Sequence, residues 1–462
     1  MIDHHPKISV CIPAFNGGRY LRQAIDSVLR QSRQDFELIV YDDASTDDTP
    51  QVVATVTDHR VRYFRNQRNK GVAATRNNCL AVARGECIAW LDADDLYYPE
   101  MLAVQSAVLD RQPNVGLVHG AYHVIDHEGQ RLPDWPLPFS SEVIESGREA
   151  FRELILSNYI TTPTVMVRRE CHDQVGPFSE TIGKSSTDWE MWLRLALRTD
   201  LAFTSKVVAQ YRQHDSSISA TTRNGERLRC DRRVVQHILS PARNVIADFE
   251  TLQRQAQAAL AAKVLLHGND AFTRKDRVEA LRAVANGFRI ATRLMSFSET
   301  LRLLVAIMTN NEYAQFRSSR KLLQQLHEPL AATRFGRRLQ KQVEDNTAWQ
   351  ATQQRIAAIM QQHVPKKARV LIVDKWDPTL FYLSRRKGWN FPDRALMPEG
   401  YPADDEKAVS HLEQLQKCGA NYLVFPNAAF WWLDHYRAFR EHLEANHARI
   451  WKDERCVIYE IL

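Results

Sequence analysis

The chain has 462 residues, of which 44% are hydrophobic and 25% are charged. This composition is typical of a folded globular protein and argues against a disordered chain, and the length predicts two or three domains. The net charge of +6 is modest. We therefore expect no nucleic acid partner.

The cysteines and the N-terminal residues indicate a cytoplasmic protein. The cysteine count is seven, and no CxxC pair occurs, which fits reduced thiols better than a disulfide framework. The first residues lack the apolar segment of a signal peptide. The apolar runs are shorter than the ~18 residues that span a bilayer. We expect any membrane contact to be peripheral, at the inner face of the membrane.

Residues 1–225 alternate short apolar segments with segments of helical periodicity. We expect strands at residues 7–13, 36–41, 61–64 and 86–91, and helices at residues 19–31, 48–56 and 72–83. This alternation predicts an α/β domain with a mostly parallel sheet and helices on its faces. Ligands of such sheets bind at the carboxyl ends of the strands.

Residues 226–364 predict a helical region, because they are rich in Ala, Leu, Gln and Arg and poor in strand signals. Residues 256–268 and 277–294 resemble one tetratricopeptide-like helical hairpin, with a break at residues 268–270. A basic stretch between Arg317 and Lys341 would suit anionic lipid. A solvated helix face explains the same cations more simply.

Residues 365–462 predict a small α/β domain of unknown role. Its expected strands are residues 369–373, 422–425 and 456–461, with a helix at residues 406–418. No GxGxxG loop occurs in it, so we expect no dinucleotide site.

Polar residues follow the first two strands of the N-terminal domain. The first strand ends in Pro13, Ala14, Phe15 and Asn16. The second ends in Asp42 and Asp43, whose carboxylates can accept hydrogen bonds from the base or ribose of a nucleotide. A turn or a helix cap would explain these residues as well.

A cation and three acids follow later elements. Arg76 lies in the first turns of a predicted helix, where it can face a phosphate. The fourth strand runs into Asp92, Ala93, Asp94 and Asp95. Crowded carboxylates repel one another, and a hard divalent cation with oxygen ligands relieves that repulsion. We therefore expect Mn²⁺ or Mg²⁺ at this strand end.

In their order and spacing these four segments resemble the family 2 glycosyltransferases of the GT-A fold, over about half of the chain. The resemblance implies a nucleotide-diphospho-sugar transferase domain at residues 1–225. It implies a metal site at Asp94 and Asp92. It implies donor-binding roles for Pro13, Ala14, Phe15, Asn16, Asp42, Asp43, Arg76, Asp92 and Ala93.

Two later segments extend the resemblance. Asp188, before a helix, corresponds to the family's catalytic base, with Glu190 as the second candidate. Thr187 stands where the family has an acid, so the usual acidic pair is incomplete. His214 lies in a segment similar to the family's closing Arg-x-His motif and is a candidate metal or diphosphate ligand. A helix cap at Asp188 and a structural histidine are the simpler alternatives.

The resemblance implies an inverting transferase that moves a sugar from a nucleotide-sugar donor, a UDP-sugar being favoured, to a hydroxyl. The acceptor would be a glycan, a lipid-linked molecule or a protein, in bacterial surface polysaccharide or other glycoconjugate synthesis. We expect acceptor specificity at residues 121–183, where Pro133, Pro136 and Pro138 predict a loop. A nucleotidyltransferase is one alternative, although the loop after the first strand has a single cation, Arg19. A non-catalytic nucleotide- or glycan-binding scaffold is the other.

Overall fold

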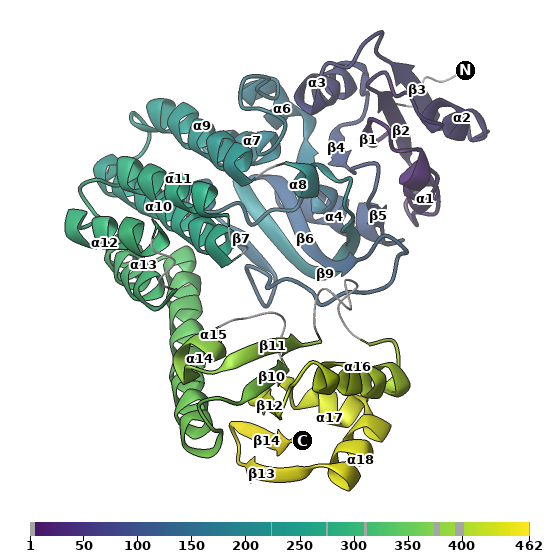
Figure 1. Ribbon diagram of the computed structural model, residues 1–462. Helices are drawn as coiled ribbons and strands as arrows, with labels where there is room; N and C mark the ends of the chain where they lie inside the picture. Colours follow the sequence, from purple (N-terminus) through teal and green to yellow (C-terminus); the bar gives the residue numbers. More distant parts are fainter. Residues whose placement is uncertain are drawn as a thin grey trace. The chain divides into compact units, whose positions relative to one another are not determined.

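The computed structural model describes residues 5–222, 224–273, 276–308, 312–373, 379–392 and 402–461 (Figure 1). The chain divides into two compact units. The first consists of Met1–Phe272, Asp276–Met308 and Arg317–Arg338, and the second of Thr273–Lys275, Thr309–Phe316 and Leu339–Leu462. The domain boundaries expected near residues 225 and 364 stay predictions. Among the described helices, none combines the length and hydrophobicity that a bilayer-spanning segment requires.

The first unit is built on a nine-stranded sheet with the order β3-β2-β1-β4-β8-β6-β9-β5, and β7 pairs with β9. The strands are β1 (Ile8–Ala14), β2 (Phe36–Asp42), β3 (Val61–Arg65), β4 (Cys87–Trp90), β5 (Leu96–Tyr97), β6 (Val115–Ile125), β7 (Val143–Glu145), β8 (Met166–Arg168) and β9 (Asp200–Arg212). The four strands expected from the sequence, β1 to β4, are parallel, which confirms that prediction. The rest of the sheet is mixed, because β5, β7 and β8 pair antiparallel with their neighbours.

Helices connect these strands. They are α1 (Gly18–Leu29), α2 (Thr49–Ala54), α3 (Val72–Val82), α4 (Met101–Arg111), α5 (Gly147–Leu154), α6 (Arg169–Val175), α7 (Thr187–Ala196) and α8 (Ile218–Thr221), with a 3-10 turn at Thr162–Thr164. The three helices predicted between the first four strands are confirmed as α1, α2 and α3.

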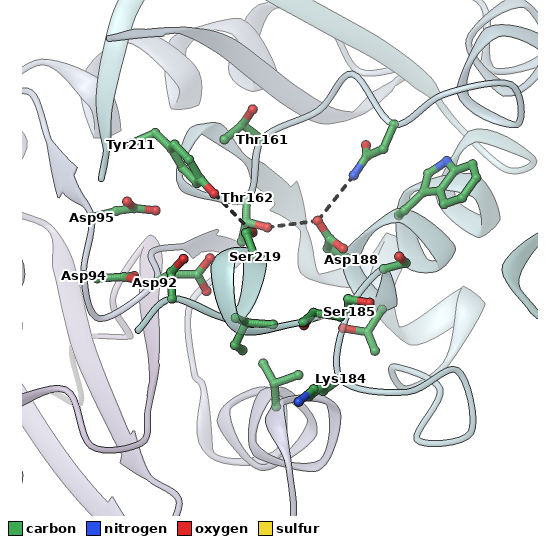
Figure 2. A pocket seen from close by; sticks show the side chains of 18 of the residues that line it. Asp92, Asp94, Asp95, Thr161, Thr162, Lys184, Ser185, Asp188, Tyr211 and Ser219 are labelled. Atoms are coloured by element: carbon green, nitrogen blue, oxygen red, sulfur yellow. Dashed lines mark hydrogen bonds between the residues drawn. The ribbon is translucent and has the colours of Figure 1, made fainter. Parts of the chain in front are cut away.

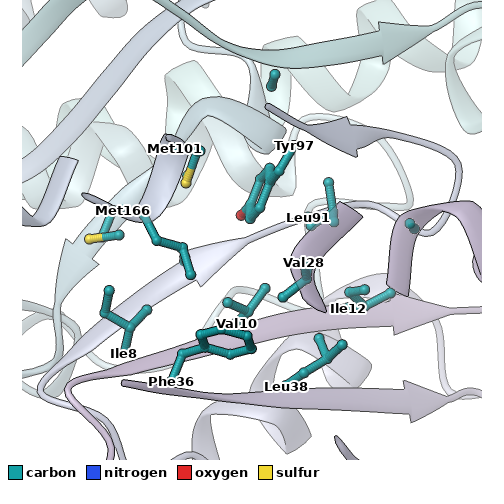
Figure 3. Packing of buried hydrophobic residues seen from close by; sticks show 14 of the residues in the cluster. Ile8, Val10, Ile12, Val28, Phe36, Leu38, Leu91, Tyr97, Met101 and Met166 are labelled. Carbon is teal, nitrogen blue, oxygen red and sulfur yellow. The ribbon is translucent and has the colours of Figure 1, made fainter. Parts of the chain in front are cut away.

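A hydrophobic core packs along β1 and β4 and reaches their carboxyl ends (Figure 3). Ile8, Val10 and Ile12 share one face of β1, because alternate residues of a strand point to the same side. Val28 of α1 and Leu91, just after β4, are fully buried in the same cluster. Close packing of this kind resists small displacements, so the strand ends are held on a rigid base.

The middle of the chain is helical, as predicted. Its helices are α9 (Asn224–Ala242), α10 (Phe249–Thr273), α11 (Arg277–Ile290), α12 (Phe297–Met308) and α13 (Glu312–His327), and a 3-10 turn at Glu328–Leu330 precedes α14 (Arg334–His363). The break expected at residues 268–270 is wrong, since α10 continues to Thr273. A Cβ on Gly268 would lie 3.0 Å from that of Ala283 on α11, so this glycine permits close helix packing.

The basic stretch of this region is partly neutralised. Lys321 pairs with Glu299 at 3.0 Å, and Arg334 pairs with Glu145 at 2.8 Å. The side chains of Arg317 and Arg320 lie outside the described residues. Arg337 and Lys341 are exposed.

The second unit contains a five-stranded sheet with the order β11-β10-β12-β14-β13. Its strands are β10 (Arg369–Val373), β11 (Lys387–Phe391), β12 (Tyr422–Pro426), β13 (Ala448–Lys452) and β14 (Cys456–Glu460). Its helices are α15 (Thr379–Ser384), α16 (Asp405–Lys417), α17 (Trp431–His435) and α18 (Arg437–Asn446), with a 3-10 turn at Asn427–Ala429. The predicted small α/β fold is confirmed.

Candidate functional site

A cleft of about 1350 Å³ opens in the first unit where β1 and β4 end. The residues expected at the site that line this cleft are Pro13, Ala14, Phe15, Asn16, Asp43, Arg76, Asp92, Ala93, Asp94, Asp188 and His214. Asp42 does not line it. Residues far apart in the sequence therefore converge, because parallel strands bring their carboxyl ends to one edge of the sheet.

The loop after β1 is fixed by the loop after β2. The Asn16 side chain accepts a hydrogen bond from the Thr46 amide at 2.8 Å, and the Asn16 amide donates to Ser45 Oγ at 2.9 Å. The Gly18 amide, which opens α1, donates to Asp47 at 2.9 Å. Phe15 is half exposed in the cleft. This anchoring gives a ligand a preformed surface.

The two acids at the end of β2 have different positions. Asp42 is fully buried and accepts hydrogen bonds from the Ser45 amide at 2.8 Å and from Tyr63 Oη at 2.7 Å. Its carboxylate is thus part of the protein interior, and the expectation that it contacts the donor does not fit this position. Asp43 lines the cleft and accepts from the backbone amides of Lys70 and Gly71, both at 2.8 Å. Asp43 is therefore the candidate for contact with a base, and it also shapes the loop before α3.

The three carboxylates after β4 have few partners (Figure 2). Asp92 accepts from Arg76 at 3.1 Å, and Asp94 meets His214 Nε2 at 2.8 Å. Asp95 accepts from the Arg212 amide at 2.7 Å through one oxygen. Its other oxygen is buried without a partner among the described residues.

The pKa values of Asp92 and Asp95 are raised in this crowded site. Burial raises the pKa of Asp92, and the charge of Arg76 opposes that rise. Burial raises the pKa of Asp95 well above its usual range, and the charges of Asp94 and Asp92 add to the effect. A bound cation would relieve both penalties, because it favours the ionised carboxylates.

Asp94 and His214 are the residues placed to hold such a cation. The His214 ring is nearly buried, packs 4.8 Å from the Tyr20 ring and meets Ser216 Oγ through Nδ1 at 2.9 Å, so Nε2 is directed at Asp94. The described residues contain no group of three or more His, Cys, Asp or Glu side chains arranged as a complete metal site. Mg²⁺ sites commonly use one or two carboxylates together with substrate phosphates. The pair therefore fits an ion that is shared with a diphosphate.

Asp188 lies across the cleft from these acids (Figure 2). It is half-buried at the start of α7, and its Oδ2 accepts long hydrogen bonds from Thr162 Oγ1 at 3.3 Å and Asn158 Nδ2 at 3.4 Å. No hydrogen bond of the described residues reaches its Oδ1. The carboxylate is thus oriented and still has an oxygen free to accept a proton.

Glu190, the second candidate base, is fully buried away from the cleft. It pairs with Arg194 at 2.8 Å and with His237 at 3.1 Å. These ion pairs give Glu190 a structural role, and Asp188 remains the candidate base.

Arg76 links the two sides of the cleft. Its guanidinium donates to Asp92 at 3.1 Å and to Thr187 Oγ1 at 3.2 Å. Thr187, which stands where the resemblance implies an acid, keeps this hydrogen bond without a second negative charge. The Arg76 charge is therefore directed to Asp92.

Sequence reasoning gave several lining residues no individual role. Asp95 had a signal, since it is the third acid of its run. The predicted acceptor stretch contributes Tyr122, Trp135 and the turn at Ser157–Pro163. The helical region contributes Arg227, Lys263 and Arg338, and no local pattern in the sequence marks them.

Comparisons with known proteins show what the N-terminal part of the chain resembles. The family model described as "Glycosyl transferase family 2" matches residues 9–176. The "Uncharacterized protein MT1568" of Mycobacterium tuberculosis is 30% identical over 233 residues, which cover 47% of this chain and 70% of that protein. The "Putative glycosyltransferase EpsE" of Bacillus subtilis is 39% identical over 140 residues, 29% of this chain and 50% of that protein.

The matches cover only part of each curated relative. The share ranges from 29% for a Rickettsia bellii protein to 70% for MT1568. Among solved structures, residues 1–349 of S. aureus TarS in complex with UDP-GlcNAc match with a TM-score of 0.50 at 19% identity. That match covers 69% of this chain and 92% of the TarS chain, and it shows a similar fold.

Proposed function

The chain belongs to the family 2 glycosyltransferases, and on this premise we propose that it transfers a sugar from a nucleoside diphosphate donor to an acceptor hydroxyl with inversion at the anomeric carbon. One observation carries the proposal. The acids after β4, with His214, and the acid of α7 line opposite sides of one cleft.

Asp188 is the proposed general base. Its free Oδ1 would take the proton of the acceptor hydroxyl as that oxygen attacks the anomeric carbon. Thr162 and Asn158 hold the carboxylate by its other oxygen. Inversion needs one base and no protein nucleophile, in contrast to retaining glycosidases, which use two carboxylates.

The opposite side of the cleft is the proposed site of the leaving diphosphate. Asp94 and His214, with Asp92 behind them, would hold Mn²⁺ or Mg²⁺. When bound, this ion supplies charge stabilisation for the leaving group. Arg76 orients Asp92 and limits the repulsion between the acids.

The finer assignments are part of the same proposal. Asp43 and residues 13–16 would bind the nucleoside of a UDP-sugar, and the UDP-GlcNAc found in TarS supports this choice of nucleotide. The acceptor would belong to bacterial surface polysaccharide or other glycoconjugate synthesis. Peripheral membrane contact would involve the exposed cations Arg337 and Lys341.

The test is to incubate the protein with a panel of UDP-sugars and Mn²⁺ and to measure UDP release. We expect release above the background with one donor or a few, and loss of that release in EDTA. Pyrophosphate release from nucleoside triphosphates would indicate a nucleotidyltransferase instead. Donor binding by calorimetry without any turnover would indicate a scaffold.

A further inference from the structure

Charges of both signs line the cleft. The strand ends and the start of α7 contribute five acids, and Arg76 lies among them; the acids are Asp43, Asp92, Asp94, Asp95 and Asp188. The wall built from α9, α10 and the start of α14 carries three cations, Arg227, Lys263 and Arg338, which we call the helical cation group. The charged residue of opposite sign on that wall is Asp231.

Lys263 contacts the helix that carries the proposed base. Its amine is 4.6 Å from the centre of the Trp189 ring, and Trp189 follows Asp188 on α7. Asp188 is the acid that would meet the acceptor, whereas Asp94 and His214 would meet the donor diphosphate. Because Lys263 contacts α7, the helix of Asp188, we assign the helical cation group to the acceptor side.

The charge of Lys263 is poorly compensated. No ion pair of the described residues includes Lys263, and burial lowers the pKa of its amine. The carboxylate of Asp231 is engaged by Ser186 Oγ at 2.7 Å. Asp231 opposes the lowering of this pKa by burial, and the charge of Arg227 adds to the lowering. The Trp189 ring offsets only part of what this cation loses on leaving water, and a bound anion would recover more.

Arg338 extends the group toward the proline-containing loop. Its guanidinium donates to the Leu137 carbonyl at 3.3 Å, and Trp135 and Pro138 of the same loop line the cleft. Arg338 has no ion pair among the described residues, so its charge is also available. Other charges nearby are already paired, since Lys184 meets Glu226 at 3.8 Å and His267 meets Glu279 at 3.0 Å.

We infer that the acceptor carries an oxyanion, a phosphate or a carboxylate, close to the hydroxyl that is glycosylated, and that Arg227, Lys263 and Arg338 bind this group. The inference rests on the proposed function, because it takes Asp188 to mark the acceptor side. It assigns a role in substrate choice to helices that lie outside the residues matched by the family model.

The test is calorimetric titration of the full chain, saturated with UDP and Mn²⁺, with three matched probes: glucose, glucose 6-phosphate and glucuronate. We expect one of the two anionic probes to bind at least about tenfold more tightly than glucose, since charge-assisted hydrogen bonds are the stronger kind. The anionic probe that binds better identifies the source of the charge. Equal affinity for all three probes would overturn the inference.

Variants locate the effect. Lys263→Met keeps the apolar stem on Trp189, and Arg227→Gln changes an exposed residue on another helix; each should weaken the anionic probe about tenfold and leave glucose unchanged. Arg254→Gln, an exposed position on α10 outside the cleft, is the matched control and should leave the affinity of all three probes unchanged.

The UDP affinity is measured in each variant. An equal loss of UDP affinity would assign the cations to the donor and overturn the inference, whereas failure of the wild type to bind UDP would instead refute the proposed function.

Discussion

The acids after β2 and the acids after β4 occupy equivalent places, at neighbouring parallel strand ends, but they have different surroundings. All four carboxylate oxygens of Asp42 and Asp43 accept hydrogen bonds from the chain. Asp92, Asp94 and Asp95 each use one oxygen in the hydrogen bonds of the described residues. The fold supplies hydrogen-bond donors to every oxygen of the first group, whereas each acid of the second group has one oxygen without a donor among the described residues.

The difference separates carboxylates that the fold already satisfies from carboxylates that need a further partner, although Asp43 also lines the cleft. A carboxylate saturated with hydrogen bonds stabilises its loop, because the folded state supplies what water would otherwise supply. A crowded carboxylate with free oxygens costs free energy in the folded state and persists where a ligand compensates for it. The same contrast recurs on α7, where Asp188 has a free oxygen and Glu190 is fully paired.

The largest expected effect is that of Asp94→Ala. We expect turnover to fall by about 10³, because the diphosphate loses its charge stabilisation, and Mn²⁺-dependent UDP binding to be lost in calorimetry. The unfolding temperature should stay near that of the wild type, since Asp94 contributes one side-chain hydrogen bond, to His214. UDP affinity at the wild-type level in the presence of Mn²⁺ would contradict this assignment.

Asp188→Asn should come next. Turnover should fall by about 10² because the amide cannot accept the proton, while UDP affinity and the unfolding temperature are retained. Glu190→Gln is the matched control on the same helix: it should lower the unfolding temperature, because it weakens a buried ion pair with Arg194. Undiminished turnover in Asp188→Asn would remove Asp188 from the role of base.

The fold class, the first four strands and half of this contrast could be predicted from the sequence. Alternating periodicities gave β1 to β4 in parallel order, and parallel order alone brings their carboxyl ends to one edge. The run from Asp92 to Asp95 was therefore predictable as a cluster. Asp188 and His214 needed the family resemblance, because neither strand pattern nor spacing connects them to that edge.

The partners of each acid could not be predicted. Asp42 and Asp43 look equivalent in the sequence, and they differ because Tyr63 of β3 reaches Asp42 whereas the amides before α3 reach Asp43. The cations that the helical region contributes to the cleft could not be predicted either. Lys263 and Arg338 lie on ordinary helices, and only tertiary packing brings them to the start of α7 and the proline-containing loop.

Asp42→Ala tests the structural half of the comparison. It removes a fully buried carboxylate and leaves the Ser45 amide and the Tyr63 hydroxyl without their acceptor. We expect a loss of about 2 kcal/mol in the free energy of unfolding, measured by urea denaturation. The KM for the donor should change little at a temperature where the variant is folded. A rise in this KM without loss of stability would indicate that Asp42 contacts the donor.

The smallest effect concerns Asp47, which anchors α1 through the Gly18 amide and also accepts from Thr49. Although burial opposes them, these hydrogen bonds lower its pKa in the folded state. The carboxylate therefore stabilises the fold above the pKa of the unfolded chain, near 3.8, and this contribution is lost as the pH falls through the lower folded value. Because the side chain is partly exposed, we expect Asp47→Asn to cost only about 0.5 kcal/mol at pH 7. Urea denaturation of the wild type and the variant between pH 7 and pH 3 should show that the difference in their free energies of unfolding becomes smaller below about pH 4. A difference that grows toward acidic pH would mean that the folded state destabilises the Asp47 carboxylate, as it does the acids after β4.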